Sequence, residues 1–252
     1  MSDLKVIPML RGKGFEYTVT DLLKSLLDSS KWDISNPNIN AQSEVHDVDV
    51  YVTRKKDNKN VRIECKLSDK DSFRLYGDSP KFQVKCMRSR TVSDNEMATR
   101  MARRYGVSRE TVLAHPDNYR DIDFDFVITS MGNAFWTTDD TGRYIFKASN
   151  EQIKTLVVLF PKIFNEKDSI DEFKKKTFNF MIFAKSKSIT ATRENNVVCR
   201  RKRCITQGTF NTCGFIPNYP AVNLKELSEG RSVWRQLADI ERALNELLDG
   251  QR

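Results

Sequence analysis

Three side chains in the first third of the chain, Asp49, Glu64 and Lys66, have the types and spacing of a site for metal-assisted hydrolysis. They lie in the stretch HDVDVYVTRKKDNKNVRIECKL, residues 46–67, whose two halves both alternate apolar and polar side chains. Such alternation predicts two half-buried strands, joined here by a polar turn at residues 55–60. Pairing the strands with their valines buried brings the three groups together on the other, open face.

Carboxylates gathered in this way raise each other's pKa unless a counter-ion is present, because like charges at short range repel. A hard divalent cation removes that cost, and Mg²⁺ typically takes one or two carboxylates together with waters and phosphate oxygens. Asp47 is an alternative to Asp49, because it falls on the same face of the same strand. The competing interpretation is a pair of ordinary amphipathic strands with solvated charges.

A helix is expected before these strands, over residues 11–30. Its apolar residues recur at three- and four-residue spacing and form one stripe, made of Phe15, Val19, Leu22, Leu23, Leu26 and Leu27. Glu16 stands at the edge of this stripe near the start of the helix.

The order of these motifs resembles the PD-(D/E)xK nuclease superfamily, in particular its Mrr-like and type II restriction endonuclease branch. The matching features are the G-F-E opening of the helix, which ends at Glu16, the D-x-D strand, and the E-C-K end of the second strand. Val48 stands where the family motif has proline, and the resemblance covers residues 11–67 and fades beyond them. It implies an α/β fold with a restriction-endonuclease-like central mixed β-sheet flanked by helices and carrying a helical insertion.

The resemblance also implies roles for individual residues. Asp49 and Glu64, with the backbone carbonyl of Cys65, would hold Mg²⁺, for which Mn²⁺ can substitute. Glu16 would complete the metal shell directly or through water. Lys66 would contact the attacking water or the scissile phosphate.

Composition is that of a globular protein with a polyanionic partner. The chain has 252 residues, treated as a single domain 1–252, and a net charge of +8, which favours binding to phosphates. No apolar run approaches the roughly twenty residues of a membrane span, and residues 1–10 lack the apolar region of a signal peptide. Five unevenly spaced cysteines do not form a disulfide framework. A cytoplasmic protein without a membrane partner is expected.

Residues 93–116 resemble a DNA-binding helix-turn-helix, centred on the sequence MARRYGVSRETV. Arg109 and Thr111 would then face the major groove of double-stranded DNA. His115 occupies a position that is usually apolar in such motifs, and a plain helical hairpin packed on the core is the alternative.

Two further basic segments are candidates for DNA contact. Residues 81–90 could follow a phosphate backbone through Lys81, Lys85 and Arg88. Residues 193–213 are expected to form a basic hairpin, whose candidate DNA-binding side chains are Arg200, Arg201, Lys202 and Arg203.

The same basic segment carries three cysteines, Cys199, Cys204 and Cys213, which could join Cys86 around zinc or an iron–sulfur cluster. No C-x-x-C pair is present and no histidine is near in sequence, so buried thiols are the favoured interpretation.

The remaining chain should extend the central sheet. Residues 121–132 alternate as a strand with Asp123 and Asp125 on a solvated face, residues 134–147 form two short strands around a turn, and residues 178–184 read as a buried strand. Residues 232–248 are expected to form one amphipathic helix.

The function expected is that of a Mg²⁺-dependent DNA endonuclease, most simply a restriction endonuclease that leaves 5′-phosphate and 3′-hydroxyl ends. A Holliday-junction resolvase, a DNA repair nuclease and an RNA-processing nuclease are alternatives with the same site, and a non-catalytic DNA-binding protein is the competing class. A homodimer is expected from chemistry alone, because cutting both strands of a duplex usually takes two active sites.

Overall fold

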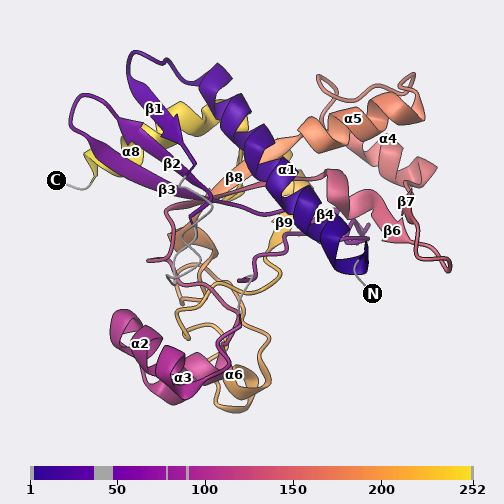
Figure 1. Cartoon of the computed structure of the whole chain (residues 1–252). Helices are drawn as coiled ribbons and strands as arrows, with labels where there is room; N and C mark the ends of the chain where they lie inside the picture. Colours follow the sequence, from indigo (N-terminus) through magenta and orange to yellow (C-terminus); the bar gives the residue numbers. More distant parts are fainter. Residues whose placement is uncertain (1–2, 37–47, 78, 89–90, 251–252) are drawn as a thin grey trace.

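A six-stranded mixed β-sheet forms the centre of the protein (Figure 1). The computed structural model describes residues 3–36, 48–77, 79–88 and 91–250, so Asp47 lies outside the described residues. In spatial order the strands are β1 (Trp32–Ser35), β2 (Val50–Arg54), β3 (Lys59–Cys65), β5 (Phe126–Ser130), β8 (Met181–Lys185) and β10 (Arg235–Gln236). The β3–β5 pair is parallel and the other pairs are antiparallel. The expected α/β class with a mixed sheet flanked by helices is therefore confirmed.

The hairpin predicted over residues 46–67 corresponds to β2 and β3. Val50 pairs with Ile63 and Val52 with Val61, and all four side chains are fully buried. Asn58 takes up a left-handed backbone conformation (φ 53°) in the turn, which asparagine tolerates better than most residues. Alternation in the sequence thus identified both the strands and the face that is buried.

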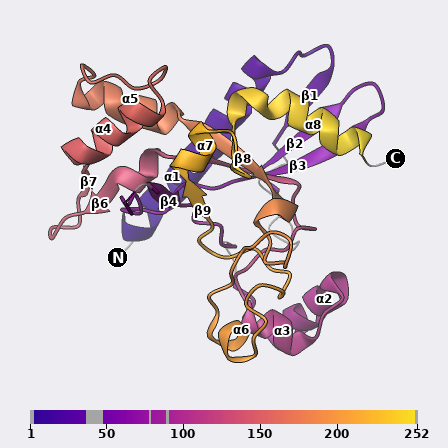
Figure 2. The same ribbon diagram turned by 180° about the vertical axis from the view of Figure 1, so that it is seen from behind.

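Two helices share an apolar cluster with this valine face of the sheet. They are α1 (Asp3–Leu26), through Phe15, Val19 and Leu23, and α8 (Ile240–Asp249), through Leu244 and Leu248. Figure 2 shows α8 lying alongside the outer strands β1 to β3. The periodic leucine stripe of α1 predicted this packing.

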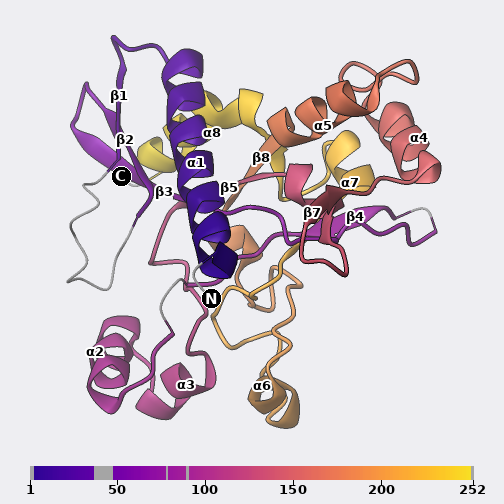
Figure 3. The same cartoon turned by 45° about the vertical axis from the view of Figure 1, so that its right-hand side comes forward.

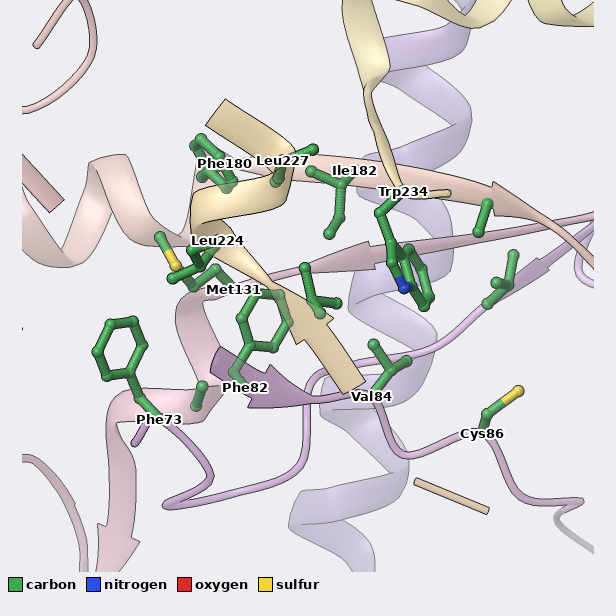
Figure 4. Packing of buried hydrophobic residues seen from close by; sticks show 14 of the residues in the cluster. Phe73, Phe82, Val84, Cys86, Met131, Phe180, Ile182, Leu224, Leu227 and Trp234 are labelled. Carbon is green, nitrogen blue, oxygen red and sulfur yellow. The ribbon is translucent and has the colours of Figure 1, made fainter. Parts of the chain in front are cut away.

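The opposite face of the sheet packs on a second and larger apolar cluster (Figure 4). This cluster includes Phe82, Leu224 and Trp234, and it joins Val127 of β5 to Ile182 of β8. The elements around it are β4 (Lys81–Gln83), β9 (Ala221–Asn223), α4 (Asn150–Leu159), α5 (Ile170–Asn179), α7 (Leu224–Ser228), η1 (Gly132–Phe135) and η2 (Ser186–Ile189). On the polar face of the hairpin Glu64 is buried and Lys66 is half-buried, so the expectation of an open face is wrong at this end of the hairpin. Further along the same face Tyr51, Thr53 and Arg62 are half-buried and Asn60 is exposed.

Two sequence predictions about the sheet are also corrected. Strands β6 (Trp136–Thr138) and β7 (Tyr144–Phe146) form their own two-stranded sheet, because β3 and β8 already occupy both edges of β5. The helix expected over residues 232–248 begins only at Ile240; before it come β10 and η3 (Leu237–Asp239). Residues Arg235 and Gln236 pair with β8 as an edge strand instead.

A separate lobe carries the candidate helix-turn-helix (Figure 3). It contains α2 (Asn95–Tyr105) and α3 (Arg109–Ala114), with Gly106 in the left-handed conformation (φ 62°) between them. The segment 193–213 joins this lobe. It forms loops around α6 (Lys202–Thr206) with no strand, so the expected hairpin is wrong there. Its two buried positions, Cys199 and Cys204, are five residues apart and do not alternate with exposed ones, a pattern that does not support strand pairing.

None of the helices in the described part of the chain has the length and apolar character needed to cross a membrane.

Candidate active site

The register of β2 and β3 places Asp49 opposite Glu64. Val50 pairs with Ile63, and the next residue outward on each strand is the acidic one. Oδ2 of Asp49 accepts a hydrogen bond of 2.8 Å from the backbone N–H of Cys65. Nζ of Lys66 lies 2.6 Å from Oε1 of Glu64. The structure therefore brings together all three side chains that the spacing selected.

This site, called here the acidic site and made of Asp49, Glu64, Lys66 and Tyr119, is largely removed from solvent. The side chain of Glu64 is 3% exposed and that of Lys66 is 14% exposed. Buried ionic groups are rare unless they are paired, since transfer of an unpaired charge out of water is costly. The burial is therefore informative: it separates this pair from the many solvated charges of an ordinary amphipathic strand.

Tyr119 is the member of the site that sequence analysis missed. Its hydroxyl donates a 2.8 Å hydrogen bond to Oε1 of Glu64, and Nζ of Lys66 lies 5.3 Å from the centroid of its ring. Tyr119 lies 55 residues beyond Glu64, in a loop that precedes β5. No periodicity or motif marks it, because only the fold carries that loop to the end of β3.

Asp49 has a strongly perturbed acidity. Burial raises the pKa of Asp49 well above its ordinary value, and the negative charges of Glu64 and Glu16 raise it further. Lys66 and the N–H of Cys65 act in the opposite direction without cancelling the shift. The pKa of Asp49 is therefore raised chiefly by burial and secondarily by two neighbouring carboxylates.

Glu16 contributes to this charge from helix α1. Phe15 anchors the helix in the apolar cluster, and the neighbouring Glu16 is left half-buried, with its carboxylate 2.6 Å from Nζ of Lys13. Its negative charge raises the pKa of Asp49 and of Cys65, so Glu16 acts electrostatically on the acidic site from α1.

Lys66 remains an ammonium at neutral pH. Burial opposes its charge, but the negative charges of Glu64 and Asp49 and the hydrogen bond to Glu64 outweigh this effect and raise the pKa of Lys66 well above its ordinary value. The chemistry available to Lys66 is therefore electrostatic stabilisation and hydrogen-bond donation and not proton abstraction.

The donor atoms of the site suit a hard cation. Asp49 and Glu64 supply carboxylate oxygens, Cys65 a backbone carbonyl, and Glu16 a further carboxylate, which are the ligand types that Mg²⁺ prefers. A cation bound there would offset both the cost of burying the charge of Asp49, which is the main cause of its raised pKa, and the repulsion from Glu64 and Glu16. The residues present thus fit a divalent metal ion.

Two further acids that were expected on a solvated strand face are paired internally. Asp123 is buried, and it contacts Arg88 and also Arg104, at 3.2 Å. Asp125 pairs with Arg62 of β3 at 3.0 Å. The prediction of a solvated face was wrong, because both carboxylates precede β5 at its contact with β3 and the lobe.

The basic residues of the segment 81–90 are placed unequally. Arg88 is buried and contacts Asp123 and Tyr105, so its predicted role in following a phosphate backbone is wrong. Lys85 is exposed, and Nζ of Lys81 lies over the ring of Tyr76 at 4.2 Å from its centroid. Among the basic residues of this segment that the structure describes, the two lysines present charge at the surface.

The other two basic candidates form a single surface. Helix α3 and helix α6 line one open pocket, to which Glu110, Leu113, Ala114, Arg201, Lys202 and Arg203 contribute. Arg203 donates a 2.9 Å hydrogen bond to the backbone carbonyl of Glu110. Arg109 and Arg200 are exposed and Thr111 is half-buried. Arg201 is instead engaged by Asp117 and Asn118, which marks it as a structural contact.

The three cysteines of the segment 193–213 also meet in space. Cys199, Cys204 and Cys213 gather around His115, whereas Cys86 lies in the large apolar cluster and does not join them. The lack of a histidine close to these cysteines in sequence does not exclude a metal site, because the fold brings His115 to them from the C-terminal end of α3.

Neither a family model nor a curated protein nor a solved structure matches this chain. The geometry of its own residues is the basis for a functional conclusion.

Proposed function

We propose that the protein is a Mg²⁺-dependent endonuclease that hydrolyses phosphodiester bonds of double-stranded DNA. The observation that carries this proposal is the convergence of Asp49, Glu64 and Lys66 at one end of the β2–β3 hairpin. An ammonium and two carboxylates that are buried or half-buried at one point form a costly arrangement, and a site that binds a cation and a phosphate would account for it.

Each residue has a distinct part in this proposal. Asp49 and Glu64 would hold the cation through their carboxylates, with the backbone carbonyl of Cys65 and the carboxylate of Glu16 completing the set. Bound Mg²⁺ supplies a Lewis acid that polarises the phosphate and lowers the pKa of a coordinated water. Lys66, held as an ammonium, stabilises the charge that gathers on the phosphate during in-line attack. Cleavage would leave 5′-phosphate and 3′-hydroxyl ends.

Within this class a restriction endonuclease of the Mrr-like or type II branch is proposed, with a sheet of the restriction-endonuclease type. In support, the chain carries a net charge of +8, and α3 and α6 form a basic surface suited to a DNA duplex. Cutting of both strands would require two copies of the site and hence a homodimer. A Holliday-junction resolvase or a repair nuclease would use the same acidic site.

A plasmid cleavage assay tests the proposal. The parent protein should convert supercoiled DNA to nicked or linear forms with Mg²⁺ or Mn²⁺ and should be inactive in EDTA. Lys66→Ala should abolish cutting while leaving DNA binding intact. Asp125→Asn is the matched control, because it breaks another partly buried ion pair made by β3 and should leave cutting unchanged. If Lys66→Ala nicks DNA as fast as the parent, the mechanism is wrong.

The choice of substrate separates the alternatives. Faster cutting of a four-way junction than of a linear duplex would indicate a resolvase, and cleavage of structured RNA in preference to DNA would indicate an RNA-processing enzyme. Tight DNA binding without cleavage in the presence of any divalent metal would indicate a non-catalytic DNA-binding protein, in which α3 and α6 would form the DNA-binding surface.

A further inference from the structure

Four side chains from two distant segments converge beside α3, in what is called here the thiol cluster. They are His115, Cys199, Cys204 and Cys213, and one ligand atom from each lies within 4.8 Å of all the others. The first three residues are buried and Cys213 is half-buried. All three cysteines are free thiols.

From this geometry we infer that the thiol cluster is a structural zinc site with three cysteine ligands and one histidine ligand. A tetrahedral zinc ion with Zn–S bonds of about 2.3 Å and a Zn–N bond of about 2.0 Å requires donor atoms about 3.6–3.8 Å apart. Nε2 of His115 lies 3.7 Å from Sγ of Cys199 and 3.0 Å from Sγ of Cys204. Small side-chain adjustments thus suffice to admit the ion.

The histidine ring is held in the orientation and tautomer that a ligand requires. Nδ1 of His115 lies 2.9 Å from the backbone carbonyl of Thr111, which can only accept, so Nδ1 carries the proton and donates. Nε2 is then left with a free lone pair directed at the sulfurs. The ring also stacks on Phe215, with centroids 4.1 Å apart and an interplanar angle of 2°. In metal-bound histidines the ring nitrogen that does not bind the metal usually donates its hydrogen to such an acceptor, which fixes the orientation of the ring.

The sulfurs have the donors that thiolate ligands need. The backbone N–H of Arg201 donates to the sulfur of Cys199, and that of Phe215 donates to the sulfur of Cys213. Each donor lies two residues after its cysteine, so the two loops present their sulfurs in the same way. Hydrogen bonds of this kind are stronger when the sulfur is charged.

The charge around the cluster is also suitable. Zinc binding releases one proton from each of the three thiols and leaves a centre with a net charge of −1, because three thiolates and a neutral imidazole surround a dication. The cysteines are interleaved with Arg200, Arg201, Lys202 and Arg203, which would offset this charge.

The surrounding chain needs such a crosslink. Between η2 and β9 the only helix or strand is the five-residue α6, and the local apolar cluster there consists of Ala191 with Cys199 and Cys204, packed by Val197 and Cys213. Long segments with so little core are unusual unless something else orders them. A zinc ion bound to His115 would attach this segment to the C-terminal end of α3 and hold the α3–α6 surface in place.

Other uses of the cluster are less consistent with its geometry. Iron–sulfur clusters usually take four cysteines, and only three are present here. A nucleophilic cysteine needs access to substrate, whereas Cys204 is 2% exposed and His115 is 3% exposed. Closed four-ligand sites without an open position are typical of structural zinc.

Metal analysis of the whole chain tests this inference independently of nuclease activity. Protein purified under reducing conditions without chelator should contain about one zinc per chain, with X-ray absorption showing three sulfur ligands and one nitrogen ligand. Replacement by Co²⁺ should give the thiolate charge-transfer and d–d absorption of a tetrahedral site. Cys204→Ala should lower the zinc content at least about tenfold, whereas Cys86→Ala, which removes a buried thiol elsewhere, should retain the metal.

Three results would overturn the zinc assignment: parent protein without zinc that also fails to bind Co²⁺ tetrahedrally, a Cys204→Ala variant that keeps full zinc with the same ligand set, or a disulfide between two of these cysteines under reducing conditions. If Cys204→Ala does not fold, the absorption spectra of the parent still decide the question.

Discussion

The acidic site and the thiol cluster are built in opposite ways. Asp49 and Glu64 come from adjacent strands of one hairpin and offer hard oxygen ligands, which suit an exchangeable Mg²⁺ ion. The thiol cluster joins His115 to cysteines 84 to 98 residues further along and offers sulfur and imidazole, which suit a permanently bound zinc ion. Under the two proposals, pairing of neighbouring strands supplies the groups for chemistry, and contacts between distant segments supply structural support.

The largest effect that separates the two regions is expected for Glu64→Gln. Removing this charge should lower the rate of DNA cleavage about 10³-fold, which corresponds to about 4 kcal/mol of transition-state stabilisation. Zinc content, measured on the same preparation, should be unchanged. An equal loss of cleavage and of zinc would mean that the two regions are not independent.

The converse variant is Cys204→Ala. Loss of a metal ligand should destabilise the fold by on the order of 2–3 kcal/mol, or roughly 4–12 °C in Tm for a chain of this size. DNA binding should weaken with it, because the segment that carries Lys202 and Arg203 loses its attachment to α3. Calorimetry of Cys204→Ala beside Cys86→Ala measures the effect, and equal shifts in Tm would argue against a metal.

Tyr119→Phe should sharpen the description of the acidic site. The hydroxyl positions Glu64 through its hydrogen bond, so we expect the cleavage rate to fall by about 10- to 100-fold, in line with roughly 1.5–3 kcal/mol for a hydrogen bond to a charged group. The Mg²⁺ concentration for half-maximal cleavage should also rise, which a purely structural role would not produce. Tyr105→Phe, which removes a similar buried hydroxyl from Asp123, is the control and should leave the Mg²⁺ dependence unchanged.

Asp49→Asn should lower the rate of DNA cleavage and raise the stability of the fold. The pKa of Asp49 is raised in the folded protein, so between the ordinary pKa of about 3.9 and the folded value the folded chain binds more protons than the unfolded chain. Stability without metal must therefore fall as pH rises through that window. The variant should remove this slope and raise Tm at neutral pH by roughly 2–4 °C, equivalent to about 1 kcal/mol. Thermal melts in EDTA across pH test the sign, and a lower Tm would contradict it.

The smallest effect is expected at the α3–α6 surface. Lys202→Ala should weaken DNA binding modestly at moderate salt and reduce the slope of log K against log salt by about one. The exposed Lys175 on α5 provides the control, since Lys175→Ala lies on another part of the surface. Equal salt slopes for parent and Lys202→Ala would remove α6 from the binding surface.

Much of the frame could be predicted from local sequence. Period-two alternation identified β2 and β3, the leucine stripe identified α1, and Ser108 with Gly106 marked the boundaries of α3 and α2. These signals work because each depends on residues a few positions apart. The same reasoning failed where strands pair across long separations in sequence. Strand β10, which pairs with β8, has only two residues and so shows no alternation of apolar and polar side chains.

By itself, the sequence determined that Asp49, Glu64 and Lys66 would meet, because strand alternation and the turn between two adjacent strands leave little freedom in their register. Only the tertiary structure decided that Glu64 is buried, that Tyr119 donates a hydrogen bond to it, and that Arg88 pairs with Asp123. It alone also joined His115 to the three cysteines. Such contacts arise from the packing of segments distant in sequence, and spacing along the chain carries no information about which of those segments become neighbours.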